Sequence, residues 1–272
     1  MKNLEKTAEC INIVGRFCGH RDINALSRQN LMESYGLPRV DLFLLFGGSI
    51  PCAAELFADA VREKIAAHYL IVGGEGHTTE SLRRKMAALC PGLLTEGKSE
   101  AEVFAGYLSQ KYGISPDYLE TASTNCGNNV TNALELIKKE GLPHDTILLM
   151  QDASMQLRMD AGFRKYLDAH SRIINFACYQ AEVIVENNAL AFRDNTITGL
   201  WDMERYITLL MGEIPRLRDD SEGYGPQGKN FIAHVDIPEH VEKAYVYIKE
   251  NYGDLTRTAN PAYATSKGEG SA

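Results

Sequence analysis

The chain has 272 residues, of which 44% are apolar and 24% charged, a mixture typical of globular proteins and unlike disordered or collagen-like chains. Its 28 basic and 36 acidic residues give a net charge of -8, whereas a general nucleic-acid or anionic-membrane binder needs a basic face. No apolar run approaches the roughly 18–20 residues that span a bilayer, and the first residues contain no signal-peptide core. We therefore expect a cytoplasmic protein that binds a small molecule, with no membrane and no nucleic-acid partner.

Cysteine usage points to free thiols. The six cysteines form no C-x-x-C pair, and their spacing matches no zinc-binding pattern. Most lie in apolar segments, where cysteine behaves as a small hydrophobic residue, and a reducing compartment keeps it reduced. They are Cys10, Cys18, Cys52, Cys90, Cys126 and Cys178.

Residues 1–36 are predicted to form a helical segment that packs on the core. Apolar residues recur there at three- and four-residue steps, which gives a helix one apolar face. They are Leu4, Ala8, Ile11, Val14 and Cys18.

Short apolar runs then alternate with helical stretches. Strands are expected at residues 41–46, 68–72, 117–121, 146–150 and 172–176. Helices are expected at 53–67, 79–89, 99–112, 128–140 and 155–167, and the sequence SEAE at 99–102 fits a capping box. The strands lack alternating polarity, which is typical of a parallel sheet covered by helices on both faces. The alternation therefore predicts an α/β fold with three layers.

Beyond residue 177 the pattern weakens. A helix is expected at 200–210, a polar, turn-rich surface loop at 212–230 and a last helix at 237–252. The predicted core spans 37–236 and includes an insert at about 199–236, whose long loop is either an active-site lid or a solvated loop with internal ion pairs. A C-terminal helical segment at 237–255 and a disordered tail at 256–272 follow.

Ligands bind at the carboxyl ends of the strands in an open parallel sheet, so the residues that follow each strand are the first candidates. Two Gly-Gly turns each lead into a helix there. Glycine permits close approach of a ligand, and a helix N-terminus attracts an anion. The alternative is that Gly-Gly only makes the turn. The candidates are Gly47, Gly48 and Ser49 after the first strand, and Gly73, Gly74, Glu75, Gly76 and His77 after the second.

No familiar nucleotide-binding motif accompanies these turns. They contain neither G-x-x-x-x-G-K-[ST] nor G-x-G-x-x-G. The acidic-glycine signature of many methyltransferases is also missing after the first strand. Phosphate, dinucleotide and methyl-transfer functions therefore lack their most specific motif.

Three titratable residues are candidates for catalysis. His77 titrates near neutral pH, and its alternative role is a local hydrogen bond at a helix start. Glu100 lies in the first turn of a predicted helix, where a carboxylate also complements the helix dipole. Asp152 ends a strand on the ligand side, and its alternative role is to cap the next helix.

Small hydrogen-bonding residues precede another predicted helix. The sequence STNCGNN at 123–129 offers Ser123, Asn125 and Asn129 as ligand contacts, or it forms a capped turn. Cys126 lies in the same turn without an obvious histidine partner, so a nucleophilic role has little support. Arg158, on the helix after Asp152, is a further candidate ligand contact.

Together these segments resemble the YdcF-type proteins of the bacterial YdcF/SanA/ElyC family. The resemblance covers about residues 1–250 and rests on VGGEGHTTES at 72–81, GKSEAEVF at 97–104, STNCGNN at 123–129 and QDASMQLRM at 151–159, with segment 199–236 the most specific. It implies a Rossmann-like three-layer sandwich with a mainly parallel sheet, extra N- and C-terminal helices and a pocket at the strand ends. The matching family positions are Gly47, Gly48, Gly73, Gly74, Glu100, Ser123, Asn125, Asn129 and Asp152.

The chain departs from the family pattern at two positions. Many members have glutamate where this chain has Asn128 and histidine where it has Ser154, and the nearby basic residue is displaced to Arg158. Chemistry that depends on those side chains is therefore not expected here. For the YdcF branch, the resemblance implies a nucleotide-like ligand such as S-adenosylmethionine.

The leading hypothesis is a protein that binds a small nucleotide-like ligand, with S-adenosylmethionine as the candidate cofactor. Glu100 and Asp152 would bind ribose hydroxyls or an amino group, and the 213–229 loop would close over the site. One alternative is a metal-dependent hydrolase or transferase acting on a phosphorylated small molecule, with the metal held by the same two carboxylates. Another is a non-enzymatic ligand sensor. The reaction, a metal requirement and the oligomeric state stay open.

Overall fold

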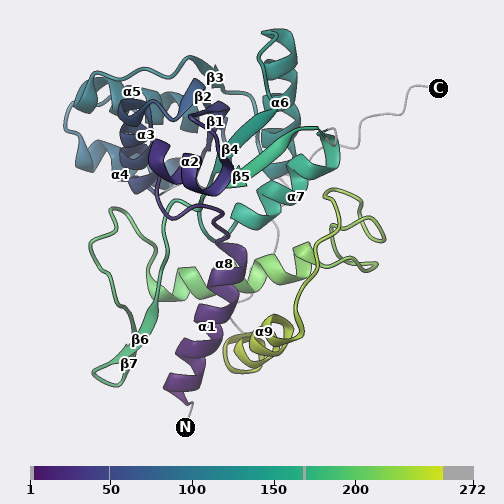
Figure 1. The fold of residues 1–272 in the computed structure, drawn as a ribbon. Helices are drawn as coiled ribbons and strands as arrows, with labels where there is room; N and C mark the ends of the chain where they lie inside the picture. Colours follow the sequence, from purple (N-terminus) through teal and green to yellow (C-terminus); the bar gives the residue numbers. More distant parts are fainter. Residues whose placement is uncertain (1–2, 49, 168–169, 254–272) are drawn as a thin grey trace.

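Five parallel strands form the central sheet of the computed structural model, which describes residues 3–48, 50–167 and 170–253 (Figure 1). Their order across the sheet is β3-β2-β1-β4-β5, and every neighbouring pair is parallel. This confirms the predicted α/β class and the mainly parallel sheet. The strands are β1 (Val40–Phe46), β2 (Ala66–Val72), β3 (Tyr118–Glu120), β4 (Thr146–Met150) and β5 (Arg172–Asn175).

Helices cover both faces of this sheet, as the apolar strands predict. Alternate residues of β1 point to opposite faces, so Phe43 packs in one apolar cluster and Leu44 in the other. The first cluster contains buried residues of α3 (Cys52–Glu63), α4 (Thr79–Leu89) and α5 (Glu100–Tyr112). The second contains buried residues of α6 (Cys126–Lys139) and α7 (Gln156–Tyr166). The result is the three-layer sandwich of a Rossmann-like fold.

The strand order creates a switch point between β1 and β4. The chain runs outward from β1 through β2 to β3 and then returns to place β4 on the other side of β1. The helices that follow β1 and β4, α3 and α7, therefore diverge to opposite faces. In open α/β sheets, ligands bind outside the carboxyl ends of the strands at such a switch point.

Residues 1–36 contain two described helices, α1 (Leu4–Cys18) and α2 (Arg28–Tyr35), where the sequence predicted a single helical segment. The chain leaves helical geometry between them because Arg21 forms an isolated antiparallel bridge with Phe176. Helix α1 packs against α8 (Met203–Leu217) and α9 (Glu239–Tyr252), below the sheet in Figure 1. The N- and C-terminal helices thus form one layer together.

A hairpin of β6 (Val183–Glu186) and β7 (Ala189–Phe192) was not predicted. Its turn consists of Asn187 and Asn188, which have φ angles of 50° and 58°. Two asparagines with positive φ between short apolar runs are a signal for a tight hairpin turn. The sequence therefore carried this information, although the prediction did not use it.

Two predicted helix boundaries differ from the structure. Helix α3 ends at Glu63 because Lys64 adopts a left-handed conformation, with φ of 53°, which lets β2 begin at Ala66. Helix α8 continues to Leu217 in spite of Pro215, so the predicted loop at 212–230 begins only at Arg218. Ser49 and the predicted tail at 256–272 lie outside the described residues. No helix in the described ranges is long and apolar enough to cross a membrane.

Candidate functional site

The loops that follow β1 and β4 meet at the switch point. The side-chain amide of Gln151 donates to the carbonyl of Gly47 across 3.2 Å, and its oxygen accepts from the backbone N–H of Asp152 at 2.6 Å. This one side chain therefore ties the first Gly-Gly turn to the end of β4. Ser49, the third predicted contact of that turn, is outside the described residues.

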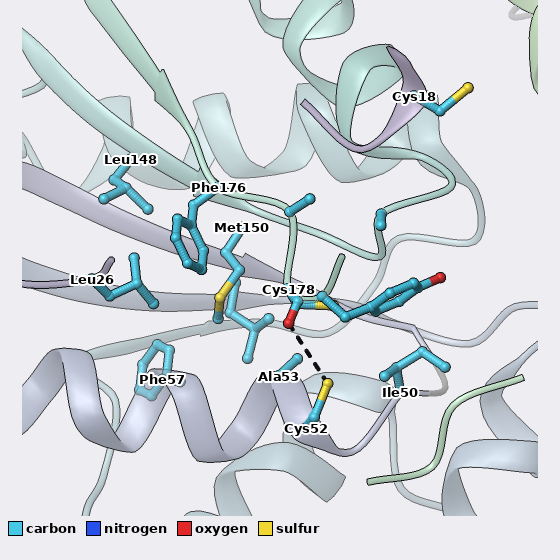
Figure 2. Packing of buried hydrophobic residues seen from close by; sticks show 14 of the residues in the cluster. Cys18, Leu26, Ile50, Cys52, Ala53, Phe57, Leu148, Met150, Phe176 and Cys178 are labelled. Carbon is cyan, nitrogen blue, oxygen red and sulfur yellow. Dashed lines mark hydrogen bonds between the residues drawn. The ribbon is translucent and has the colours of Figure 1, made fainter. Parts of the chain in front are cut away.

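The floor beneath these loops is apolar. Figure 2 shows Ile50, Cys52 and Ala53 at the start of α3 facing Cys178, which follows β5. The Cys52 thiol donates to the Cys178 carbonyl across 3.7 Å, and both residues are buried. Burial raises the pKa of the Cys178 thiol well above its ordinary value, so the thiol form is favoured. This packing joins the first turn of α3 to the fifth strand.

Close packing explains most of the glycines in the two Gly-Gly turns. A methyl group on Gly47 would lie 2.3 Å from Oε2 of Glu100 and 3.1 Å from the Cα of Gly73. One on Gly74 would lie 2.1 Å from the Ser123 carbonyl oxygen. Gly48 differs, because a methyl group there would meet only the side-chain oxygen of Gln151, at 3.4 Å. The turn interpretation therefore accounts for three glycines, while Gly48 has room for a methyl group in ordinary contact with Gln151.

Glu100 is a buried carboxyl group between the two Gly-Gly turns. It is the first residue of α5 and directly follows Ser99, the N-cap residue of the predicted capping box. Glu100 is only 7% exposed. Its Oε1 accepts hydrogen bonds from the hydroxyls of Thr78 and Thr79, at 3.0 and 2.9 Å. No hydrogen bond from any described residue reaches Oε2, which lies beside Gly47. Burial raises the pKa of Glu100, as expected for a carboxyl group removed from water.

Asp152 is also buried, but its oxygens already have donors. Oδ1 accepts from the backbone N–H and hydroxyl of Ser154, at 2.9 and 2.7 Å, and from the hydroxyl of Tyr179 at 2.8 Å. Oδ2 accepts from the indole N–H of Trp201 at 2.9 Å. Asp152 thus shapes the turn before α7 and holds two aromatic side chains at the end of β4.

Residues 198–201, here called the strap, cross the switch point from the segment between β7 and α8. In Figure 1 this segment leaves the hairpin, rises toward α4 and returns to α8. The carbonyl of Thr198 accepts from the backbone N–H of Cys52 at 3.2 Å, and the carbonyl of Gly199 accepts from the Lys85 ammonium at 2.7 Å. The strap therefore covers the start of α3, and Trp201 completes it by contacting Asp152.

Lys85 is a residue of this site that the sequence prediction missed. It projects from α4, and its ammonium lies 4.6 Å from the centre of the Trp201 ring. Burial lowers the pKa of Lys85, although the nearby charges of Asp152 and Asp202 oppose the shift. In the sequence, Lys85 lies between Leu82 and Met86, which are buried on the inward face of α4. This position is the signal from which Lys85 could have been predicted.

The predicted cluster at 123–129 has largely structural roles. Ser123 accepts from the backbone N–H of Gly74 at 3.0 Å and so fastens the loop after β3 to the second Gly-Gly turn. Asn125 caps α6 by accepting from the backbone N–H of Asn128 at 3.0 Å, and Asn129 is buried in the first turn of that helix. The capped-turn interpretation therefore describes Asn125.

Glu120, at the end of β3, was not predicted. Its Oε1 accepts from the backbone N–H groups of Ala122 and Ser123, at 2.7 and 2.9 Å, and from the Asn132 amide at 3.0 Å. Its Oε2 is buried without a hydrogen-bond partner in the described structure. Among the described residues, this is the buried carboxyl oxygen of the edge that lacks a partner.

The remaining predicted contacts lie at the rim or are engaged elsewhere. Glu75 and His77 are exposed in the loop after β2, and Glu75 forms an ion pair with Arg83 at 3.2 Å. Arg158 is buried in a bidentate ion pair with Glu213, so its guanidinium is turned to α8. The structure therefore gives Arg158 a role in joining helices, where the sequence indicated a ligand contact.

The segment that directly follows the loop predicted as a lid packs against α7. Residues 213–217 belong to α8, and the segment after them contacts the second half of α7. Arg164 donates to the His234 carbonyl at 3.1 Å, and Lys165 donates to Asn230. Helix α7 starts at the carboxyl edge and is 11 residues long, so its last turn is roughly 15 Å away from that edge.

The carboxyl edge as a whole is acidic. Its carboxyl groups belong to Glu75, Glu100, Glu120 and Asp152, and its cationic groups to Arg83 and Lys85. The described residues include no group of three or more His, Cys, Asp or Glu side chains placed to hold a metal ion. Comparison with models of known protein families finds no match for this chain.

Proposed function

We propose that the chain binds a small nucleotide-like ligand at the carboxyl edge of the switch point, and that S-adenosylmethionine is the leading candidate. The observation that carries this proposal is Glu100. Glu100 is only 7% exposed, and Thr78 and Thr79 hold its Oε1, whereas its Oε2 beside Gly47 has no hydrogen bond from a described residue and is not fully buried. In dinucleotide-binding folds a carboxylate at this edge binds ribose hydroxyls, and such a hydroxyl would satisfy Oε2.

The charge of the edge supports a cationic or neutral nucleoside over a polyphosphate. Carboxylates outnumber cations there, and the principal cation, Lys85, already donates to the strap. A triphosphate would meet repulsion from these carboxylates, whereas a sulfonium or an ammonium group would be attracted. S-adenosylmethionine carries both cationic groups, and the resemblance to the YdcF-type proteins independently favours this ligand.

Each element of the edge has a definite task in this proposal. Glu100 accepts hydrogen bonds from the ribose, and the room at Gly48 lets the ligand approach the backbone of the first turn. Thr78 and Thr79 hold the Glu100 carboxyl group in place. S-adenosylmethionine supplies an activated methyl group when it is bound. The reaction that uses it is not part of the proposal.

Calorimetric titration of the purified chain with S-adenosylmethionine, S-adenosylhomocysteine, NAD and ATP, with and without magnesium, tests the proposal. We expect the adenosyl sulfur compounds to bind and Glu100→Gln to weaken them by roughly 10- to 100-fold, since it replaces a charged acceptor by an amide. Glu135→Gln, on the exposed face of α6, is the matched control and should bind normally. Unchanged affinity in Glu100→Gln, or preference for magnesium with ATP, would contradict the proposal.

A further inference from the structure

Glu120, the last residue of β3, has one carboxylate oxygen without a hydrogen-bond donor in the described structure. That oxygen, Oε2, is buried, and the residue as a whole is only 7% exposed. A buried acceptor without a donor is unfavourable, and more so when the acceptor carries charge. A donor that comes from outside the chain would therefore stabilise Glu120.

The other oxygen of Glu120 fixes the carboxyl group in place. Oε1 accepts from the backbone N–H groups of Ala122 and Ser123, at 2.7 and 2.9 Å, and from the Asn132 amide at 3.0 Å. These three donors are neutral, so none of them offsets the negative charge of the carboxylate. The result is an acceptor that is already oriented and that favours an N–H donor through a charge-assisted hydrogen bond.

Glu120 and Glu100 are neighbours of the same Gly-Gly turn. The backbone N–H of Gly73 donates to the Glu120 carbonyl, and the backbone N–H of Glu100 donates to the Gly74 carbonyl, both at 2.9 Å. A bound group that reaches the turn between β2 and α4 therefore lies close to both carboxyl groups.

The two carboxyl groups lie on opposite faces of the sheet. Glu120 is in register with Val72, whose side chain belongs to the apolar cluster under α6 and α7, and the Asn132 amide comes from α6. Glu100 instead begins α5, which covers the other face. A ligand that contacts both must extend across the end of β2.

We propose that Glu120 Oε2 accepts a hydrogen bond from the exocyclic amino group of the ligand's base, and so selects an amino-substituted base over its oxo counterpart. This assignment rests on the proposed function, because the ligand is the nucleoside proposed there and its ribose lies at Glu100. It adds the residue that recognises the base and the chemical feature that is recognised.

A base suits the surroundings of Glu120 better than an ammonium group does. Its amino group donates N–H bonds while the ring remains apolar, and the neighbouring side chains of Val72 and Val130 are apolar and buried. An ammonium group would have to lose its full hydration shell at this buried position, which is costly. An oxo group would place a second acceptor against the bare carboxylate oxygen.

Entry of the base requires movement of the loop at residues 121–124, because Oε2 is closed off from solvent. This loop supplies two of the donors to Oε1, and its residues Thr121, Ala122 and Thr124 are exposed. The loop moves outward as the base enters and leaves Glu120 attached to Asn132.

Calorimetric titration of the natural chain with two matched pairs of probes tests the selection of the base. S-adenosylhomocysteine is compared with S-inosylhomocysteine, and 5′-methylthioadenosine with 5′-methylthioinosine, so that in each pair an oxo group replaces the amino group. We expect the oxo probe to bind roughly 10- to 100-fold more weakly in both pairs. The second pair lacks the amino acid end, so its ratio does not depend on the ammonium group of the ligand.

Glu120→Gln tests the residue itself. Its amide oxygen keeps the three donors of Oε1, and its N–H groups stand in the place of Oε2, where they donate to an oxo group. We expect the ratio of the two dissociation constants to fall to about threefold or to reverse. Glu135→Gln, on the exposed face of α6, is the matched control and should keep the natural ratio.

The outcomes distinguish this inference from the proposed function. If amino and oxo probes bind the natural chain equally, or Glu120→Gln keeps the natural ratio, the inference is wrong and the nucleoside site stands. If only the pair with the amino acid end shows a preference, the base is not the donor and the inference is again wrong. If no probe binds, both are wrong. Should Glu120→Gln not fold, the two ratios of the natural chain decide.

Discussion

The guanidinium of Arg158 donates to both carboxylate oxygens of Glu213, from Nε at 2.6 Å and from Nη2 at 2.9 Å. The pair joins α7 of the sandwich to α8 of the layer that carries both terminal helices. Both side chains are largely withdrawn from water. An ion pair in such surroundings makes each partner depend on the other, because either charge alone would be buried without compensation.

Removing one partner of this pair should therefore cost more than removing both. We expect Glu213→Ala to lower the free energy of unfolding by about 3–5 kcal/mol. The double variant Arg158→Met with Glu213→Leu should recover most of that loss, since it leaves no buried charge. Urea denaturation of the three proteins measures the difference. A double variant no more stable than Glu213→Ala would show that packing around the pair, and not its charge, is decisive.

The raised pKa of Glu100 predicts a pH-dependent stability difference. Burial raises its folded-state pKa above the ordinary value of 4.5, so the folded chain holds the proton more tightly than the unfolded chain does. Ionisation of Glu100 therefore lowers the free energy of unfolding. The full loss is present above the folded-state pKa, and no loss is present below 4.5. Glu100→Gln removes this cost and should gain stability relative to the natural chain as pH rises through that window.

The measurement is the urea midpoint of both proteins between pH 4 and pH 8, and the difference between the midpoints should open as the pH rises above 4.5. Glu135→Gln, which is exposed, supplies the baseline. A gap that is constant with pH would mean that Glu100 keeps its ordinary pKa in the folded protein.

The two glycines of the first turn should respond differently to a methyl group. Gly47→Ala places it 2.3 Å from Oε2 of Glu100 and should lower stability by about 1–3 kcal/mol through overpacking. Gly48→Ala meets only Gln151, at 3.4 Å, and should change stability by less than about 0.5 kcal/mol. Thermal unfolding compares the two directly, and equal losses would contradict the room assigned to Gly48.

Cys126 should be the most reactive thiol of the native protein. It is the described cysteine with a partly exposed side chain, while the other five are buried. Burial raises the pKa of Cys10, Cys18 and Cys178, which further slows their reaction. We expect iodoacetamide to modify the native chain first at Cys126, as peptide mass mapping would show. Rapid modification that persists in Cys126→Ser would place the reactive thiol elsewhere.

The sequence was sufficient for the features that depend on neighbouring residues. The continuous apolar run of β1 and the Gly-Gly turn after it placed the first strand and the edge at which it ends. Ser99 and Glu102 form the predicted capping box because both partners lie within a single turn. Glu100 was identified for the same reason, since its position follows from where α5 begins.

Contacts between residues that lie far apart in the chain could not be predicted from the sequence. Asp152 meets Trp201, and Arg158 meets Glu213, across about 50 residues of chain. Hydrophobic periodicity locates the elements but does not say which charged side chains face one another. The predicted roles of Arg158 and of the long loop therefore rested on position along the chain, and Lys85 was missed because its partners come from the strap.

Helix α1 packs against α9, so two helices that lie far apart in the chain are packing partners (Figure 1). The 220 residues between Cys18 and Glu239 take roughly 10–45 s to synthesise at about 5–20 residues per second. During that time the apolar stripe of α1, with Ile11 and Val14 at its centre, stays without its final cover. The part of this apolar stripe that packs against α9 is therefore covered only after α9 has been synthesised.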